Sequence, residues 1–273
     1  MGIIKHTEAP SRHRHLEQQN TTSLLYGMNE EDQLVPQITK QAIPQIAPLV
    51  DAIVDHLLSG GRLFYLGAGT SGRLGIVDAS ECPPTFGVDH GLVIGLIAGG
   101  DGAIRKAVEF AEDDPKQGWK DLQQYGFNHK DVLVGIAASG TTPYVVGAVQ
   151  EATAQGMITG CITCNENTPL AAAATFPIEV ITGPEFVTGS TRLKAGTAQK
   201  LTLNMLTTTA MIKLGRVEDN RMIDMQLSND KLVERGTKMV MAATPLDFDT
   251  AQRLLLREGS VRKSIEKYQM EKK

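Results

Sequence analysis

The sequence predicts an α/β fold in which a doubly wound parallel sheet is preceded by helices and followed by a small helical appendage. Five short apolar runs, each closed by Gly, Ser or Asn, occur between residues 62 and 183, and segments of helical length follow most of them. The runs show no clear alternation, which is typical of strands covered on both faces. We therefore expect an arm over residues 1–27, an α/β domain with its leading helices over 28–217, and the helical appendage over 218–273.

The segment before the sheet is expected to hold an arm and then one or two helices. The first two dozen residues are polar and lack a sustained period, which predicts a solvated or partner-contacting arm. Asn29 is the expected N-cap of a helix that carries acids in its first turn and stops at Gly60-Gly61. Three prolines interrupt this run, so we expect one kinked helix or two. They are Pro36, Pro44 and Pro48.

The predicted strands lie within residues 62–69, 90–100, 130–140, 156–166 and 176–183. The fourth run contains Cys161 and Cys164 in a C-x-x-C spacing. Positions three apart in a buried strand face opposite sides, so two core thiols are favoured over a redox pair. The run 197–215 is apolar nearly all round, and its length and its threonines favour a core-covering helix over a membrane span.

Composition and charge exclude several classes of partner. With 273 residues, 41% of them hydrophobic and 21% charged, the chain can bury a full core. The net charge of −4 argues against nucleic acid and against anionic membranes, because both require a concentrated basic surface. The sequence shows no signal peptide, and its three cysteines do not make a disulfide framework. We therefore expect a cytoplasmic protein.

Two segments, 65–77 and 135–149, repeat the order of strand, small hydroxylated loop and helix. Loops at the carboxyl ends of parallel strands share one edge of the sheet, so both should line one site. Free N–H groups at a helix start, the helix dipole and hydroxyl donors together suit a phosphate. Plain helix capping explains one such loop, but two loops, with a third segment of like character at 188–197, favour phosphate. The candidate binding residues are Gly69, Thr70, Ser71, Ser139, Gly140, Thr141, Thr142, Ser190 and Lys194.

A nucleotide is the rival ligand for such loops. Residues 67–72, Gly-Ala-Gly-Thr-Ser-Gly, lack the lysine of the G-x-x-x-x-G-K-[ST] motif. Their glycine spacing approaches G-x-G-x-x-G, but no acid follows a second strand to hold a ribose. A small phosphorylated metabolite fits these loops better.

Four motifs carry a resemblance to a known group of proteins. They lie at residues 67–87, 98–114, 137–145 and 188–200. They resemble the sugar isomerase, or phosphosugar-binding, domain and, within that group, the N-acetylmuramic acid 6-phosphate etherase family. The resemblance runs from about Thr7 to Gly236, and the tail is similar to the family's ubiquitin-associated-like appendage with a curtailed last helix. Relatives often have arginine at the position of Thr141, so this chain has one candidate cation fewer near the phosphate.

The resemblance implies an enzyme that cleaves D-lactate from N-acetylmuramic acid 6-phosphate and leaves N-acetylglucosamine 6-phosphate. It also implies a homodimer with sites near the subunit interface. Opening the sugar ring exposes an aldehyde that acidifies C2–H, so lactate can leave by β-elimination and water can then add at C3. One base and one acid suffice for this chemistry. The sequence has no His, Cys and carboxylate set at metal-ligand spacing, so we expect neither a metal nor an organic cofactor.

Several acids could serve as that base and that acid: Glu81, Glu109, Glu112, Asp113, Asp114 and Glu185. Glu81 is expected to follow the first helix, among apolar residues, where a carboxyl group stays protonated as a general acid must. Glu112 is expected to end a helical run from Asp101, and its spacing alone favours a solvated helix-end acid. The resemblance maps the family's two functional glutamates onto Glu81 and Glu112. We expect Glu112 to be the base and Glu81 the acid.

The sequence predicts the roles of three other charged residues less precisely. Arg192 and Lys194 could neutralise the phosphate or the lactyl carboxylate, or they could make surface pairs. Asp78, on the first helix, is expected to be structural.

Two other functions remain open from the sequence. A phosphosugar isomerase needs the same pocket and a base at C2, but no acid for a leaving group at C3. A sugar-phosphate sensor needs a pocket without catalytic acids and usually carries an attached DNA-binding or catalytic domain.

Overall fold

The computed structural model describes residues 5–271, which form two compact units. The first unit comprises the chain up to Ala79 together with Leu92–Thr208. The second comprises Ser80–Gly91 and the chain from Thr209 onward. Two long helices, α4 (Gly69–Phe86) and α9 (Lys194–Lys213), run from the first unit into the second.

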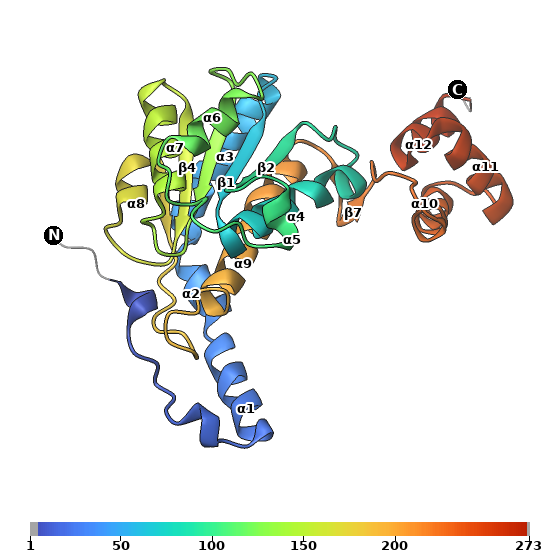
Figure 1. Ribbon diagram of the computed structural model, residues 1–273. Helices are drawn as coiled ribbons and strands as arrows, with labels where there is room; N and C mark the ends of the chain where they lie inside the picture. Colours follow the sequence, from blue (N-terminus) through green and yellow to red (C-terminus); the bar gives the residue numbers. More distant parts are fainter. Residues whose placement is uncertain (1–4, 272–273) are drawn as a thin grey trace. The chain divides into compact units, whose positions relative to one another are not determined.

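A five-stranded parallel sheet forms the centre of the first unit (Figure 1). Its strands are β1 (Leu63–Gly67), β2 (Val93–Ile97), β3 (Val132–Ile136), β4 (Ile158–Thr163) and β5 (Phe176–Glu179). Each strand lies within one of the predicted apolar runs, so the expected doubly wound fold is confirmed. The strand order is β2-β1-β3-β4-β5, and the direction in which the chain adds strands reverses between β1 and β3.

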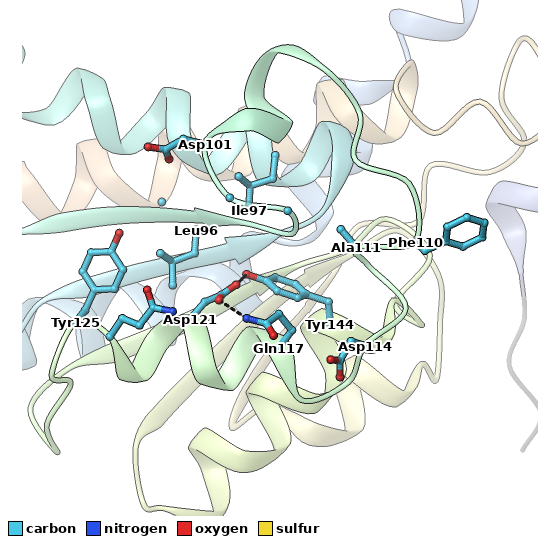
Figure 2. Close-up of a pocket in the computed structure, with 14 residues that line it drawn as sticks. Leu96, Ile97, Asp101, Phe110, Ala111, Asp114, Gln117, Asp121, Tyr125 and Tyr144 are labelled. Atoms are coloured by element: carbon cyan, nitrogen blue, oxygen red, sulfur yellow. Dashed lines mark hydrogen bonds between the residues drawn. The ribbon is translucent and has the colours of Figure 1, made fainter.

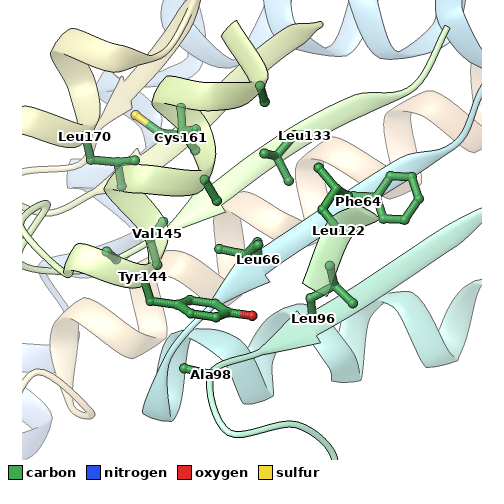
Figure 3. Close-up of a cluster of buried hydrophobic side chains, with 14 of the residues drawn as sticks. Phe64, Leu66, Leu96, Ala98, Leu122, Leu133, Tyr144, Val145, Cys161 and Leu170 are labelled. Carbon is green, nitrogen blue, oxygen red and sulfur yellow. The ribbon is translucent and has the colours of Figure 1, made fainter. Parts of the chain in front are cut away.

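Helices cover both faces of this sheet, which is why its strands are apolar on both sides. One face carries α6 (Gln117–Gln123), α7 (Pro143–Ala154) and α8 (Pro169–Ala173). Figure 3 shows their side chains packed on Phe64, Leu66 and Leu133, which the helices exclude from solvent. On the other face, Leu49 of α3 (Ile43–Leu58) contacts Gly160 of β4.

The helices before the sheet differ from the prediction. The chain forms α1 (Thr21–Asp32), α2 (Val35–Gln41) and then α3. The expected N-cap at Asn29 is wrong, because α1 already begins at Thr21, where Asn20 Oδ1 accepts the N–H of Ser23 at 2.9 Å. Pro36 and Pro44 lie in the first turns of α2 and α3, where a missing N–H is harmless, so these prolines start helices instead of kinking one.

The described residues before α1, 5–20, are exposed or half-buried except for Thr7, so the segment is attached to the rest of the chain at one buried point within the predicted solvated or partner-contacting arm. It forms short 3-10 turns at His6–Glu8 and Leu16–Gln18, and Thr7 within it is fully buried. Thr7 and Asn165, the second residue after β4, bind each other twice: Asn165 Oδ1 accepts the N–H of Thr7 at 3.0 Å, and its Nδ2 donates to Thr7 Oγ1 at 2.9 Å. These bonds fix the segment to the loop after β4.

The second unit is mainly helical, as its sequence predicts. After a short hairpin of β6 (Val217–Glu218) and β7 (Arg221–Met222), it contains α10 (Asp230–Ala243), α11 (Phe248–Glu258) and α12 (Val261–Met270). The side chains of Asn229, Asp247 and Ser260 cap these three helices. The hairpin was not predicted, because two-residue strands leave no periodic signal.

The C-x-x-C pair lies in the core, as predicted. Cys161 is in β4 and Cys164 follows it, and both are buried free thiols. Burial raises the pKa of each to about 12, which suppresses the thiolate that redox chemistry requires. Between residues 5 and 271, the model contains no helix long and apolar enough to cross a membrane.

Asp78 of α4 gives the fold a testable pH dependence. It is almost fully buried, and burial raises its pKa to about 6, although hydrogen bonds from Thr207 and Tyr65 oppose that rise. Between about pH 4 and 6 the folded chain therefore holds a proton that the unfolded chain has lost, so stability falls as pH rises through this window. In Asp78→Asn this fall should be absent. Between pH 4 and pH 7 the free energy of unfolding of the variant should therefore rise relative to that of wild type by up to about 3 kcal/mol. Urea unfolding at the two pH values measures it. Equal pH dependence in both proteins would contradict the prediction.

Candidate functional site

The candidate site lies at the carboxyl edge of the sheet, where the strand order reverses. Gly67 at the end of β1 pairs in register with Ile136 at the end of β3, so the loops after these two strands are neighbours. In open α/β sheets this reversal point opens the crevice that holds ligands. The sequence prediction that the loops at 67–71 and 137–142 share one edge is confirmed.

The first loop feeds directly into α4, whose first residues are Gly69, Thr70 and Ser71. Its backbone N–H groups are therefore those of a helix start, and the positive end of the helix dipole lies there. Ser71 is buried and its hydroxyl donates to Oε1 of Gln199 on α9 at 3.0 Å. A methyl group on Gly196 would lie 3.4 Å from Cγ2 of Thr70, so the starts of α4 and α9 are in contact.

The second loop also ends in a helix start. Thr142 is the N-cap of α7 and Pro143 its first residue, as predicted, and the Thr142 side chain makes no capping bond within the helix. Oγ of Ser139 accepts the N–H of Thr141 at 3.2 Å, which leaves its proton for a ligand. Gly140 has φ +68°, and a side chain there would collide with Thr168 at 2.4 Å.

Asn165 holds this second loop from behind. The amide, nearly completely buried, donates from Nδ2 to the carbonyl oxygens of Ala138 and Ser139, both at 3.3 Å, in addition to its bonds with Thr7. The sequence analysis missed Asn165, because a single Asn after a strand is an ordinary loop residue and its partner is more than 150 positions away.

The third segment runs into the start of α9, and its two basic residues have different surroundings. Lys194 is only 1% exposed, and its ammonium group binds the carboxylate of Glu31 on α1. The Lys194–Glu31 ion pair is therefore buried and is not a surface pair. Arg192, by contrast, is exposed, and Ser190 is half-buried two residues before it.

Glu112 lies in a turn and not at the end of a helix. The helix α5 (Gly102–Arg105) is short, and Phe110 has φ +60°, which a right-handed helix cannot accommodate. The carbonyl oxygen of Glu112 accepts the N–H of Tyr144 at 3.0 Å, so the turn is attached to the first turn of α7.

Figure 2 shows the pocket beside this turn, into which Tyr144 points from α7. The Tyr144 hydroxyl donates to Asp121 at 2.8 Å, and Gln117 donates to the other oxygen of that carboxylate at 2.7 Å. Burial, together with Asp121, raises the pKa of Tyr144. This fixed tyrosine is the anchor for the Glu112 turn.

Glu112 and the start of α4 line one cavity of about 160 Å³. Its wall also includes Glu109 and Arg73. The guanidinium group of Arg73 donates to the carbonyl oxygens of Ala103 and Ile104, at 2.8 and 2.9 Å, which ties α4 to α5. Arg73 was not among the predicted residues, although it lies in the first glycine-rich motif.

Glu81 differs from its prediction in two ways. The helix α4 continues through Pro83 and Pro84 to Phe86, so Glu81 lies within it. Its side chain is exposed, because the helix turns Cys82 into the interior instead. The expected apolar surroundings of Glu81 are therefore wrong for this chain.

Of the predicted residues, the structure brings Gly69 and Glu112 to one cavity and places Ser139, Gly140, Thr141 and Thr142 in the neighbouring loop. Glu81 belongs to the second unit and Glu112 to the first. In the described part of the chain, no three His, Cys, Asp or Glu side chains are grouped so that they could hold a metal ion.

Comparison with known proteins places these features in a family. Residues 45–153 match the model of the glucokinase regulatory protein N-terminal SIS domain, and residues 127–209 match that of the SIS domain. An N-acetylmuramic acid 6-phosphate etherase from Christiangramia forsetii is 61% identical over 97% of this chain and 97% of its own. One from Bacteroides fragilis is 55% identical over 98% of this chain and 95% of its own.

Solved structures share the fold at much lower identity. A phosphoheptose isomerase from Francisella tularensis has a TM-score of 0.53 and 22% identity, and the match covers 71% of this chain and all (100%) of that one. At this level the likeness establishes the SIS fold, in agreement with the observed sheet.

Proposed function

The chain belongs to the N-acetylmuramic acid 6-phosphate etherase family, and from that membership we propose that it cleaves the D-lactyl ether of N-acetylmuramic acid 6-phosphate. The products are N-acetylglucosamine 6-phosphate and D-lactate, and the setting is the recycling or catabolism of cell-wall amino sugars. The observation that carries the proposal is the shared cavity of Glu112 and the start of α4, because it offers a carboxylate beside a helix start, which is a feature suited to bind phosphate.

The reaction proceeds by elimination and then hydration. The ring-opened sugar presents an aldehyde at C1, and Glu112 removes the proton from C2. The C3–O bond breaks, and the departing lactyl oxygen takes a proton from Glu81, whose part in the reaction rests on the family resemblance and not on its surroundings. This leaves a C2=C3 double bond conjugated with the aldehyde. Water then adds its oxygen to C3 and a proton returns to C2, so every atom is accounted for.

The decisive assay is incubation with N-acetylmuramic acid 6-phosphate followed by measurement of released D-lactate. The isomerase alternative is tested in parallel with glucosamine 6-phosphate and glucose 6-phosphate, from which an isomerase would form fructose 6-phosphate. Lactate release without that product supports the etherase. Fructose 6-phosphate without lactate release would contradict it.

The phosphate is proposed to bind at the ends of the two loops. The hydroxyl groups of Ser139 and Ser71 there differ in their hydrogen bonds. The Ser139 hydroxyl accepts a bond and keeps its proton for the phosphate, whereas Ser71 donates its own proton to Gln199. Ser139→Ala should weaken phosphosugar binding by about 1–2 kcal/mol, and Ser71→Ala should weaken it less. Calorimetric titration with N-acetylglucosamine 6-phosphate measures both. Unchanged affinity in Ser139→Ala would place the phosphate elsewhere.

We further propose that the chain acts as a homodimer with its sites near the subunit interface, in the cytoplasm. The turn that carries Glu112 exposes two apolar side chains, Val108 and Phe110, the latter 82% exposed, and a partner would cover them. Three free buried thiols fit a reducing compartment. Light scattering that finds a stable, active monomer at micromolar concentration would contradict the dimer.

A further inference from the structure

Glu185 is a buried carboxylate that the proposed reaction leaves without a role. It lies in the loop after β5 and is 1% exposed. Its two oxygens accept two backbone N–H groups at the start of α9, from Lys194 at 2.9 Å and from Ala195 at 3.0 Å. A charge is costly to bury unless hydrogen bonds compensate it, and the two backbone N–H groups of α9 supply that compensation.

A chain of charges extends from this cap to the N-terminal part of the molecule. The buried ammonium group of Lys194 binds Glu31 on α1, and the other oxygen of Glu31 lies 3.3 Å from Nε2 of His13. Burial is the largest single influence on the pKa of the Glu31 carboxyl and raises it, but the hydrogen bond and charge of Lys194, the hydrogen bond of His13 and the charge of Arg12 together outweigh burial, so the pKa is lowered. The first turn of α9 is thus fixed by its backbone to Glu185 and by its side chain to Glu31.

The same turn of α9 supports the first phosphate loop. Gly196 lies beside Thr70, where an added methyl group would be 3.4 Å from Cγ2 of Thr70, and Oε1 of Gln199 accepts a hydrogen bond from the Ser71 hydroxyl. A shift at the start of α9 therefore moves the residues at the start of α4.

We propose that Glu185 is a positioning residue of the phosphosugar site, which holds the start of α9 and, through it, Thr70 and Ser71 in the arrangement that receives the phosphate. This assignment of Glu185 rests on the proposed function, because it requires that the chain bind a phosphosugar. Lys194 then acts from behind the loop and does not itself touch the ligand.

The test is Glu185→Gln, in which an amide NH2 replaces one of the two accepting oxygens and faces a backbone N–H. We expect KM for N-acetylmuramic acid 6-phosphate to rise by about tenfold while kcat changes by less than about threefold, because the loop is displaced and the reacting groups are not. The affinity for N-acetylglucosamine 6-phosphate should fall by a similar factor.

Asp131→Asn is the matched control. Asp131 is also a fully buried carboxylate and also accepts two backbone N–H groups, from Arg62 at 2.8 Å and from Asn128 at 2.9 Å. It lies at the amino end of β3, on the opposite edge of the sheet. This variant should lose stability and leave KM unchanged. An equal rise of KM in both variants would show a general structural effect and overturn the proposal.

Glu31→Gln provides a second variant if Glu185→Gln does not fold, because it leaves the Glu185 cap intact while it weakens the contacts of Glu31 with Lys194 and His13. It should raise KM in the same direction and by a smaller factor. If Glu185→Gln folds and its KM is unchanged, the proposal is overturned. If only Glu31→Gln folds, an unchanged KM in that variant overturns it. Absence of lactate release in the wild type would instead reject the proposed function, so the two failures are distinguishable.

Discussion

Glu112→Gln is expected to abolish both D-lactate release and hydrogen exchange at C2 of the substrate. If Glu112 removes the C2 proton, an amide in its place cannot accept it, so no carbanion forms and no later step follows. Glu81→Gln should stop lactate release and leave C2 exchange in place, because the carbanion still forms and is reprotonated when the lactyl oxygen is not. Nuclear magnetic resonance in D2O follows exchange, and a lactate dehydrogenase assay follows release.

Glu109→Gln is the matched control for Glu112. Glu109 is exposed like Glu112 and lines the same cavity. The Glu109→Gln variant should retain most of the D-lactate release of wild type. If exchange is lost in Glu81→Gln and kept in Glu112→Gln, the two glutamates exchange roles and the elimination stands. Full activity in either Glu81→Gln or Glu112→Gln would refute the two-carboxylate proposal itself.

Gly140→Ala should damage both stability and substrate binding. Its φ of +68° lies in the left-handed region, where a side chain costs about 1–2 kcal/mol. The added methyl would also meet Thr168 at 2.4 Å. Thr168 cannot retreat easily, because it is fully buried and its hydroxyl caps α8 by accepting the N–H of Ala171 at 3.1 Å. The loop must therefore move, and Ser139 and Thr141 move with it.

We expect Gly140→Ala to lower the free energy of unfolding by about 2–4 kcal/mol and to raise KM at least tenfold. Gly156→Ala is the control, since Gly156 has φ +78° and open space around it. Gly156→Ala has the conformational cost of a positive φ without the collision. Gly156 lies in the turn between α7 and β4, at the opposite end of α7 from Gly140. Thermal unfolding and steady-state kinetics compare the two. Equal effects on KM would contradict the role assigned to the second loop.

The sheet and its two loops could be predicted from the sequence because their signals are local. A buried parallel strand is a short apolar run, and a helix start such as Thr142-Pro143 is specified by two adjacent residues. The same reasoning failed for Asn29, where the acidic residues that end α1 resembled the first turn of a new helix. It failed again for Glu112, because a positive φ at Phe110 has no signal in an ordinary residue type.

The supporting groups of the site could not be predicted for a different reason. Lys194 and Glu31 are buried together although the sequence separates them by 163 positions, and nothing local marks either as buried. Asn165 joins Thr7 to the second loop in the same way. Such pairs arise from the packing of the N-terminal segment on the loops, which only the three-dimensional structure shows.

The fate of the C2 hydrogen and of the C3 oxygen tests the elimination directly. When N-acetylmuramic acid 6-phosphate is turned over in D2O, the N-acetylglucosamine 6-phosphate formed should carry deuterium at C2. When it is turned over in water labelled with ¹⁸O, the heavy oxygen should appear at C3 of the sugar and not in D-lactate. Product that carries ordinary hydrogen at C2, or lactate that carries the heavy oxygen, would show direct displacement and contradict this mechanism.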